Sequence, residues 1–509
     1  MGSPHVFVIY DSQIIRHIYA KVKEMAKIQY QKVKSLKPWY IEKMRDFLRK
    51  QWGSMLLVVV LLVSLPLTLP LAQNAWKFLT GASYEPASLV VQVDQVGAPL
   101  KRVWEGVSQG HEEKDLRLDT AIAGMKGTGI KYVRIDHILD GFGVVSRGDD
   151  GQLHYDFTKL DLLVSDIIAM GATPYFSVSY MPAAISRGDI TDLPKDFGEY
   201  GAVVANYVGH YSRDYKGGLN NVIYEIWNEP DLFGSFKTYG DKNYLALYRT
   251  AANAATGVKN TKPFLIGGPA TTGFYPAWAK DYYTALADVR KDFFSWHRYS
   301  TNADDIVKDA RLATETIAPL TKTPQKLFIS EWGIAADRGG VYDSKLAAAH
   351  FLAVSRALLD TNVDLALAFE IQDGPNNGDT QFHGGWGMLT NPKFGPVVAK
   401  PRLRALQFIQ KLQGSRLPIA GEGSYVTAVA TKNDLGKIQV LAVNYDPSGS
   451  HEELFPITFA GLAAGTYTVT EEYFSGRKLA ADIAIPGGML KRDIVLPASE
   501  SVIVSVVAK

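Results

Sequence analysis

Eight short apolar runs, each followed by a stretch with helical spacing, are the feature that most limits how this chain can fold. The runs lack the alternation of a half-exposed strand, which suits parallel strands covered on both faces. In the stretch Phe157–Met170, for example, Leu160, Leu163 and Ile167 recur at helical intervals. Eight such units over about 310 residues predict an α/β fold, a (β/α)8 TIM barrel rather than an open sheet. The expected strands are Val103–Val107, Ile130–Asp136, Thr173–Tyr180, Asn221–Asn228, Phe264–Gly268, Asp292–His297, Lys326–Glu331 and Val363–Ile371.

The helical periods stop after the barrel region 103–414. From Ser415 to Lys509 short β-rich runs alternate with turns, which predicts a C-terminal antiparallel β-sandwich. The region 77–102 reads as a linker, and Leu89–Val93 within it is a candidate extra strand for the sandwich. Structural support of the barrel and carbohydrate binding both remain open as roles for this domain. The expected sandwich strands are Ser424–Lys432, Lys437–Tyr445, Thr466–Tyr473 and Ser501–Val507.

An apolar run near the N-terminus predicts a single transmembrane helix. Met55–Ala72 is 18 residues long, just enough to span a bilayer, and Trp52 and Trp76 flank it at interfacial positions. A core helix would carry a polar face, and a signal peptide would have a shorter leader and a better cleavage site. We therefore expect residues 54–76 to be a membrane anchor.

The charge distribution sets the expected orientation of this anchor. Residues 1–53 contain eleven Lys or Arg and only four acidic residues, whereas the whole chain has a net charge of +2. Basic residues remain on the cytoplasmic side, so the rest of the chain is expected in the periplasm or outside the cell, held at the inner (plasma) membrane. The basic segment has amphipathic helical spacing and either lies on lipid or a membrane partner, or is a solvated leader. The acidic remainder gives no indication of nucleic-acid binding.

Two glutamates stand at the ends of predicted strands. Glu229 follows the apolar run Asn221–Asn228 in the sequence Trp-Asn-Glu-Pro, and Glu331 ends a later run in the sequence Ser-Glu-Trp-Gly. A single strand-end glutamate is usually a solvated loop charge, but barrel active sites collect at the C-terminal strand ends. The pair therefore indicates an acid/base and a nucleophile.

These motifs resemble the retaining glycoside hydrolases that carry catalytic glutamates on barrel strands four and seven. The closest likeness is to glycoside hydrolase family 39, which includes β-xylosidases, α-L-iduronidases and bacterial exopolysaccharide hydrolases. The resemblance runs from about Val103 to Leu412. It also rests on Asp292–Tyr299, which is similar to the family's sixth strand, on Pro174–Pro182, and on Phe382–Leu389.

The resemblance implies roles for individual residues. Glu229 is implied as the acid/base and Glu331 as the nucleophile, with the two carboxyls about 5–5.5 Å apart. Arg134 and Tyr299 are expected to hold Glu331, although an Arg134–Asp136 ion pair and simple packing of Tyr299 are the alternatives. The remaining substrate-binding candidates are Asn228, expected to donate to the sugar 2-hydroxyl, His297, which could instead be a core histidine, and Trp386.

One departure from the family concerns the tryptophan that usually forms the floor of the sugar site at strand eight. Phe369 occupies the matching run here, so either Phe369 replaces that tryptophan or Trp386 takes its place. The ten histidines are scattered without ligand spacing, and the chain has no cysteine, so neither a metal nor a cofactor is indicated.

The sequence therefore predicts a membrane-anchored retaining glycosidase that cleaves a polysaccharide, an exopolysaccharide by analogy, outside the cytoplasm. Membrane-bound polysaccharide synthesis or export machinery is the partner that such an anchor suggests. The alternatives are an exo-acting β-xylosidase-like enzyme and a non-catalytic scaffold that binds polysaccharide or a synthase.

Overall fold

The computed structural model describes residues 21, 84–110, 113, 116–375 and 380–509. In this part of the chain no helix combines the length and the apolar character that a membrane crossing requires. The predicted anchor 54–76, with its apolar run Met55–Ala72, lies outside the described residues. So does the basic segment 1–53, apart from Lys21.

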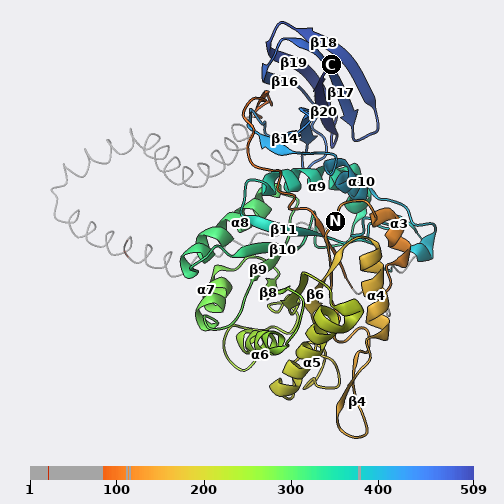
Figure 1. The fold of residues 1–509 in the computed structure, drawn as a ribbon, viewed down its shortest axis with the longest axis vertical. Helices are drawn as coiled ribbons and strands as arrows, with labels where there is room; N and C mark the ends of the chain where they lie inside the picture. Colours follow the sequence, from red (N-terminus) through yellow and green to blue (C-terminus); the bar gives the residue numbers. More distant parts are fainter. Residues whose placement is uncertain (1–20, 22–83, 111–112, 114–115, 376–379) are drawn as a thin grey trace, which may run out of the picture. The chain divides into compact units, whose positions relative to one another are not determined.

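Eight parallel strands close into a barrel, which confirms the predicted fold (Figure 1). The strands follow one another around the barrel in chain order, and the last, β11, pairs with the first, β2. The first strand begins three residues later than predicted, at Gly106 instead of Val103. The strands are β2 (Gly106–Gln109), β3 (Tyr132–Ile135), β6 (Thr173–Val178), β7 (Val222–Ile226), β8 (Phe264–Thr271), β9 (Phe293–Tyr299), β10 (Lys326–Gly333) and β11 (Val363–Phe369).

A helix follows every barrel strand, as expected for a (β/α)8 fold. The predicted helical stretch Phe157–Met170 corresponds to α4 within one residue at each end. The helices are α3 (Ile122–Met125), α4 (Thr158–Ala169), α5 (Phe197–Gly209), α6 (Tyr244–Gly257), α7 (Pro276–Ala285), α8 (Ala303–Ile317), α9 (Lys345–Leu358) and α10 (Pro401–Ile409). A small hairpin, β4 (Val145–Arg147) and β5 (Leu153–Tyr155), lies between β3 and α4.

The barrel strands are buried on both faces, which explains their continuous apolar runs. One cluster of side chains fills the interior, with Tyr175, Phe293, Phe328 and Leu367 among its members. A larger cluster packs the outer strand faces against the helices. Because side chains fill the interior, the loops at the C-terminal ends of the strands are where a barrel of this kind places its active site.

Residues after the barrel form two sheets that share one apolar cluster, which includes Val91, Ile457 and Val504. Leu89–Val93 does supply a strand, β1, to the smaller sheet. Among the described strands after residue 414 the pairings are antiparallel, as predicted, whereas β1, which comes from before the barrel, pairs parallel with β16. β1 reaches the sheet from before the barrel and is not joined to β16 by a hairpin, so its direction is not constrained by a turn.

The smaller sheet has the order β13-β1-β16-β19 and the larger one β12-β14-β15-β20-β17-β18. Sequence periodicity missed β16, β18 and β19, whose solvent-facing positions carry mixed apolar and charged side chains. The strands are β1 (Leu89–Gln92), β12 (Ser415–Leu417), β13 (Ile419–Ala420), β14 (Val426–Lys432), β15 (Ile438–Asn444), β16 (Glu453–Leu462), β17 (Gly465–Tyr473), β18 (Lys478–Ile485), β19 (Gly488–Leu496) and β20 (Ser501–Ala508).

The larger sheet packs against the barrel helices through one face. Leu441 and Ile503 belong to the barrel's apolar cluster, and the Arg356 guanidinium on α9 pairs with Glu422 at 2.9 Å. This face of the sandwich is therefore covered by the barrel and is not available to a ligand.

Candidate active site

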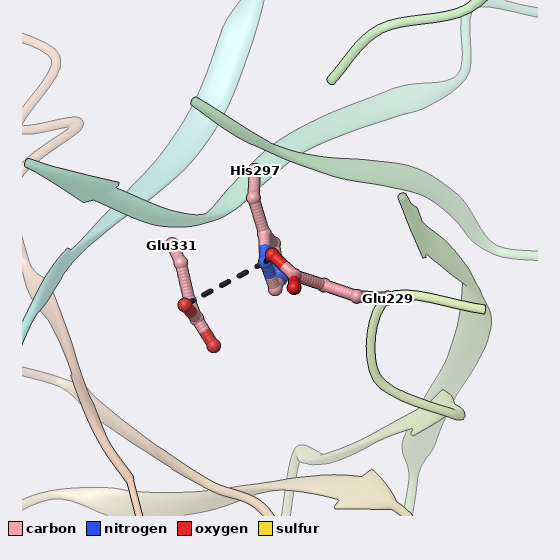
Figure 2. Close-up of side chains that lie close together, drawn as sticks. All are labelled: Glu229, His297 and Glu331. Atoms are coloured by element: carbon pink, nitrogen blue, oxygen red, sulfur yellow. Dashed lines mark hydrogen bonds and ion pairs between the residues drawn. The ribbon is translucent and has the colours of Figure 1, made fainter. Parts of the chain in front are cut away.

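Five of the predicted site residues come from four strands spread around the barrel and meet at the C-terminal strand ends. Arg134 lies on β3, Glu229 follows β7, His297 and Tyr299 lie on β9, and Glu331 lies on β10. In chain order β7 is the fourth barrel strand and β10 the seventh. Figure 2 shows the side chains of Glu229, His297 and Glu331 converging, with the Glu229 carboxyl overlapping the His297 ring in this view and Glu331 beside them.

The two carboxylates are close enough for a retaining mechanism. Single ligand atoms of Glu229, His297 and Glu331 lie within 4.8 Å of one another. Retaining glycosidases hold their carboxyl groups about 5–5.5 Å apart, whereas inverting enzymes need about 6.5–9.5 Å to admit a water between them. An oxygen of each carboxyl group thus lies close enough to the other for the shorter, retaining spacing.

The backbone around Glu229 is bent so that the side chain faces the site. Trp227 and Glu229 have φ angles of 74° and 46°, which is the left-handed region that residues other than glycine rarely adopt. The Glu229 amide donates to the carbonyl of Ala270 at 2.9 Å, and this contact holds the turn beside β8. Strained residues persist where surrounding contacts impose them, and such residues concentrate at functional sites.

A register shift delivers Glu331 to the same place. The pairing of β10 with β9 shifts between Ile329 and Glu331, after which Glu331 lies opposite His297. Irregularities of this kind redirect a side chain relative to an ideal strand. Both carboxylates are largely enclosed, with side-chain exposures of 14% for Glu229 and 8% for Glu331.

Arg134 connects three acceptors beneath the site. Its guanidinium donates to Glu331 at 2.7 Å, to Glu225 at 2.7 Å and to the Asn228 side-chain oxygen at 2.8 Å. Burial alone would lower the pKa of Arg134, but the charges of Glu225 and Glu331 outweigh it and raise that pKa. Arg134 is thus a fixed cation under the nucleophile candidate, and the charge of Asp136, the alternative partner, also raises the pKa of Arg134.

The amide of Asn228 is oriented by its neighbours on both sides. Its oxygen accepts from Arg134, so its nitrogen must face the opposite way, where it donates to the Tyr180 hydroxyl at 2.7 Å. The amide nitrogen carries a second N–H besides the one that the Tyr180 hydroxyl accepts.

His297 bridges the two catalytic candidates. Its Nδ1 lies 2.8 Å from a Glu229 oxygen and 3.6 Å from a Glu331 oxygen, and the side chain is fully buried. Burial alone would lower the pKa of His297, but the charge of Glu331 and the hydrogen bond and charge of Glu229 raise it. A histidine that only packs in the core would have no such partners.

Glu331 is subject to opposing influences. Burial raises the pKa of Glu331 and the like charge of Glu229 adds to this, so its pKa lies above the usual value although the cations His297 and Arg134 act in the opposite direction. The Tyr299 hydroxyl donates to the second Glu331 oxygen at 2.9 Å. Each oxygen of Glu331 therefore accepts a hydrogen bond that favours the ionised form.

Trp386 is not in contact with the carboxylates. Its ring packs edge-on against Phe369 with the centroids 5.6 Å apart, and Phe369 in turn lies 6.4 Å from the Tyr299 ring. Phe369 thus occupies the position nearer to Glu331, and Trp386 extends the same aromatic wall outward, with the Arg338 guanidinium stacked 4.6 Å from its ring centroid.

Sequence reasoning missed Glu225 and Tyr180. Glu225 is completely buried inside β7 and accepts from Arg134 and from the Tyr175 hydroxyl, the latter at 2.7 Å. Its signal was present, because a carboxylate within an apolar run must have a buried partner. Tyr180 gave no comparable signal, since an aromatic residue at a strand end most often only packs.

Glu229, His297 and Glu331 are also the three groups whose spacing could hold a metal ion. Glu331 already accepts from Arg134 and Tyr299, and His297 is directed at Glu229. A cation would have to displace the guanidinium or compete with its charge, so this donor set fits paired acid and nucleophile chemistry better than a metal.

Comparison with known proteins identifies related sequences over most of the chain. A family model described as glycosyl hydrolases family 39 matches residues 89–452. A β-xylosidase of Caldicellulosiruptor saccharolyticus is 29% identical over 350 residues, which cover 62% of this chain and 69% of the relative. A β-xylosidase of Geobacillus stearothermophilus is 26% identical over 398 residues, covering 68% of this chain and 75% of the relative.

Solved structures share the same fold. The crystal structure of a GH39 enzyme from Xanthomonas axonopodis pv. citri superposes with a TM-score of 0.67 at 19% sequence identity. The superposition covers 84% of this chain and 98% of that one, so it includes both the barrel and the sandwich.

Proposed function

Because the chain belongs to glycosyl hydrolase family 39 and is a glycosidase, we propose that it hydrolyses a polysaccharide with retention at the anomeric carbon. Glu229 acts as acid/base and Glu331 as nucleophile. The observation that carries this proposal is that an oxygen of each carboxyl group lies within 4.8 Å of the other, and that the His297 Nδ1 lies 2.8 Å from Glu229 and 3.6 Å from Glu331.

In the first step Glu229 gives its proton to the glycosidic oxygen while Glu331 attacks the anomeric carbon. The bond to the leaving sugar breaks, and a covalent glycosyl ester on Glu331 forms through an oxocarbenium-like transition state. His297 engages one Glu229 oxygen, which leaves the other to carry the transferable proton. In the second step the ionised Glu229 takes a proton from water, and that water cleaves the ester with net retention.

The supporting residues act on charge and position. Arg134 and Tyr299 donate to the ionised form of Glu331 and offset part of the cost of burying it. The remaining N–H of Asn228 donates to the sugar 2-hydroxyl, a contact that strengthens as the transition state forms. Phe369 and, further out, Trp386 form the wall on the strand-eight side.

For the substrate we propose an exopolysaccharide met outside the cytoplasm. This rests on the predicted anchor 54–76, on the basic segment 1–53 that would keep the N-terminus inside, and on the analogy with exopolysaccharide hydrolases of the family. An enzyme held there could trim glycan delivered by membrane-bound synthesis or export machinery. An exo-acting β-xylosidase is the second candidate, and the names of the two β-xylosidase relatives favour it.

A product profile separates these two candidates. The wild-type protein would be assayed on a panel of aryl glycosides that includes aryl β-xyloside, and on exopolysaccharide isolated from the producing cell. Glu331→Gln serves as the control for contaminating activity. Oligosaccharides released from the exopolysaccharide support the first candidate. Release of xylose alone from xylosides supports the second, and no turnover of any substrate contradicts both.

A further inference from the structure

Exposed aromatic side chains are concentrated at one end of the barrel. Among the described residues from 85 onward, the exposed aromatic residues all lie in loops that leave the C-terminal ends of barrel strands. Isolated exposed apolar residues are ordinary on any surface, but a concentration beside a reactive pair indicates a binding surface. These residues are Phe233, Tyr239, Tyr275 and Phe382.

The loop that follows Glu229 displays two of its apolar side chains while its backbone is fixed. The amides of Leu232 and Phe233 donate to the Glu229 carbonyl, at 3.0 and 2.7 Å, and the Phe233 carbonyl accepts from the Trp227 indole at 3.0 Å. Leu232 is nevertheless 57% exposed and Phe233 41%. Because both backbone groups of Phe233 are held, the exposure of its ring does not come from a loose loop.

Neighbouring loops continue this apolar surface on both sides. On one side Gly234 packs so closely on Thr191 that an added Cβ would lie 2.5 Å from the Thr191 carbonyl oxygen, and Ile190 beside it is 40% exposed. On the other side Asp231 accepts a hydrogen bond from the Thr272 amide at 3.0 Å. The Thr272 hydroxyl in turn lies 2.9 Å from the hydroxyl of Tyr275, which holds that ring in place while 41% of the residue is exposed.

The position of this surface relative to Glu229 defines what it would contact. The ring centroids of Phe233 and Tyr180 are 5.8 Å apart, and Tyr180 orients Asn228. The surface therefore begins at the edge of the site that holds Glu229 and Glu331. An acid that protonates the leaving oxygen must stand on the side of the leaving group. Chain that extends beyond the cleaved bond therefore passes over the loop that carries Glu229.

We infer that Ile190, Leu232, Phe233 and Tyr275 form a platform that binds the leaving-group side of a glycan, by stacking on the C–H faces of its sugar rings. This inference rests on the proposed function, because the acid/base role of Glu229 decides which side is the leaving side. It deepens that function by naming the substrate class. The leaving group is an oligosaccharide of at least two sugars with an apolar ring face, and not a small alcohol or a single sugar.

Chain-length dependence tests the platform. The assay compares wild type with Phe233→Ala, Tyr275→Ala and the double variant. The substrates are a 4-nitrophenyl glycoside and oligosaccharides of increasing length of the same sugar, with the xylose series tested first. We expect kcat/KM of the wild type to rise along the ladder. In the double variant the ratio of kcat/KM for the longer oligosaccharide to that for the aryl glycoside should fall about 5-fold or more, because two stacking contacts are lost.

Leu312→Ala is the matched control, because Leu312 is 40% exposed but lies on α8 at the flank of the barrel. In Leu312→Ala the ratio of kcat/KM for the longer oligosaccharide to that for the aryl glycoside should equal the ratio of the wild type. Thermal unfolding of each variant checks that the fold is intact. If the double variant turns over all substrates normally and its kcat/KM shows no loss that grows with oligosaccharide length, the platform is overturned but the proposed function is not. No turnover of any substrate by the wild type overturns the proposed function, and the platform with it.

Discussion

Arg134 and Glu225 form an ion pair at 2.7 Å in which the two side chains are 1% and 0% exposed. The pair lies directly beneath the reactive carboxylates, because the same guanidinium also donates to Glu331. Burial alone would raise the pKa of Glu225, but the nearby charges of Arg134 and His297 lower it. The site therefore contains, besides Glu229 and Glu331, a third carboxylate that remains ionised and takes no direct part in the proposed chemistry.

Removing that charge should destabilise the fold. Glu225→Gln leaves the buried guanidinium with less compensation, and breaking one partner of a buried pair typically costs about 3–5 kcal/mol. Urea unfolding measures the change. Glu199→Gln is the control, since Glu199 pairs with Arg147 at the same 2.7 Å but both side chains are about one-third exposed. The control should lose less than about 1 kcal/mol. Equal losses of unfolding free energy in Glu225→Gln and Glu199→Gln would contradict the expectation that the buried ion pair is the costlier one to break.

Sequence reasoning named Glu229 and Glu331 but not Glu225, and the difference lies in the position of each residue along its strand. Glu229 and Glu331 were found because each follows an apolar run, and the end of a buried strand in a barrel is a predictable location. Glu225 lies inside such a run, where its neighbours specify a strand regardless of its charge. Its partner Arg134 comes from another strand, so only the barrel's closure reveals the contact.

The sequence named Phe369 and Trp386 as alternatives for the wall beside Glu331 but could not place the two rings relative to each other. Trp386 lies in the long connection between β11 and α10, and no periodicity relates a loop residue to a strand. Its placement depends on the Phe369 ring and on buried cations at the start of α10. Among these, the Arg402 guanidinium donates to the carbonyls of Phe369 and Trp386 at 2.7 and 2.8 Å. Such contacts can be seen only once the tertiary structure is known.

Glu331→Gln should remove turnover almost completely. A nucleophile that is lost from a covalent mechanism lowers kcat by a factor on the order of 10⁴–10⁶. Proton NMR of the first product released by the wild type gives the independent test, because two displacements at one carbon restore its configuration. An inverted first product would exclude the nucleophile role of Glu331.

Glu229→Ala should lose activity according to the leaving group. General acid catalysis contributes roughly 10²–10⁴-fold, so substrates with a poor leaving group should suffer most and activated aryl glycosides least. Azide should restore turnover of the activated substrate and yield a glycosyl azide of retained configuration, since the small anion enters the space left by the carboxylate. Glu199→Ala, with its exposed carboxylate, should show neither effect. If azide fails to rescue Glu229→Ala, Glu229 is not the acid/base.

The proposed orientation of the chain makes a prediction that depends only on residues 1–76. An alkaline phosphatase reporter fused after Lys509 should be active, because that enzyme matures only outside the cytoplasm, and the fusion should sediment with the membrane fraction. Removal of residues 1–76 should make the fusion inactive and free of the membrane. A full-length fusion that is inactive, although present in normal amount, would contradict the orientation that the basic segment implies.

Two buried histidines should give pH dependences of stability with opposite sign. The raised pKa of His297 means that the folded state holds a proton which the unfolded chain releases near its usual value of about 6.5. The stabilisation from His297 is therefore fully present below about pH 6.5 and is lost as the pH rises through the raised value. Subtracting the unfolding free energy of His297→Asn from that of wild type should reveal this decline.

His350 provides the matched comparison. Burial, together with the charge of Arg402, lowers its pKa to about 3, so the folded state holds this ring neutral. Below about pH 6.5 His350 binds a proton in the unfolded chain but stays neutral in the folded state, so stability falls as the solution becomes more acidic. The difference between wild type and His350→Asn should therefore grow with pH up to about 6.5 and level off there, at the pH where the His297 difference begins to shrink. Slopes of the same sign would show that the charges of Glu229 and Glu331 do not hold the proton on His297.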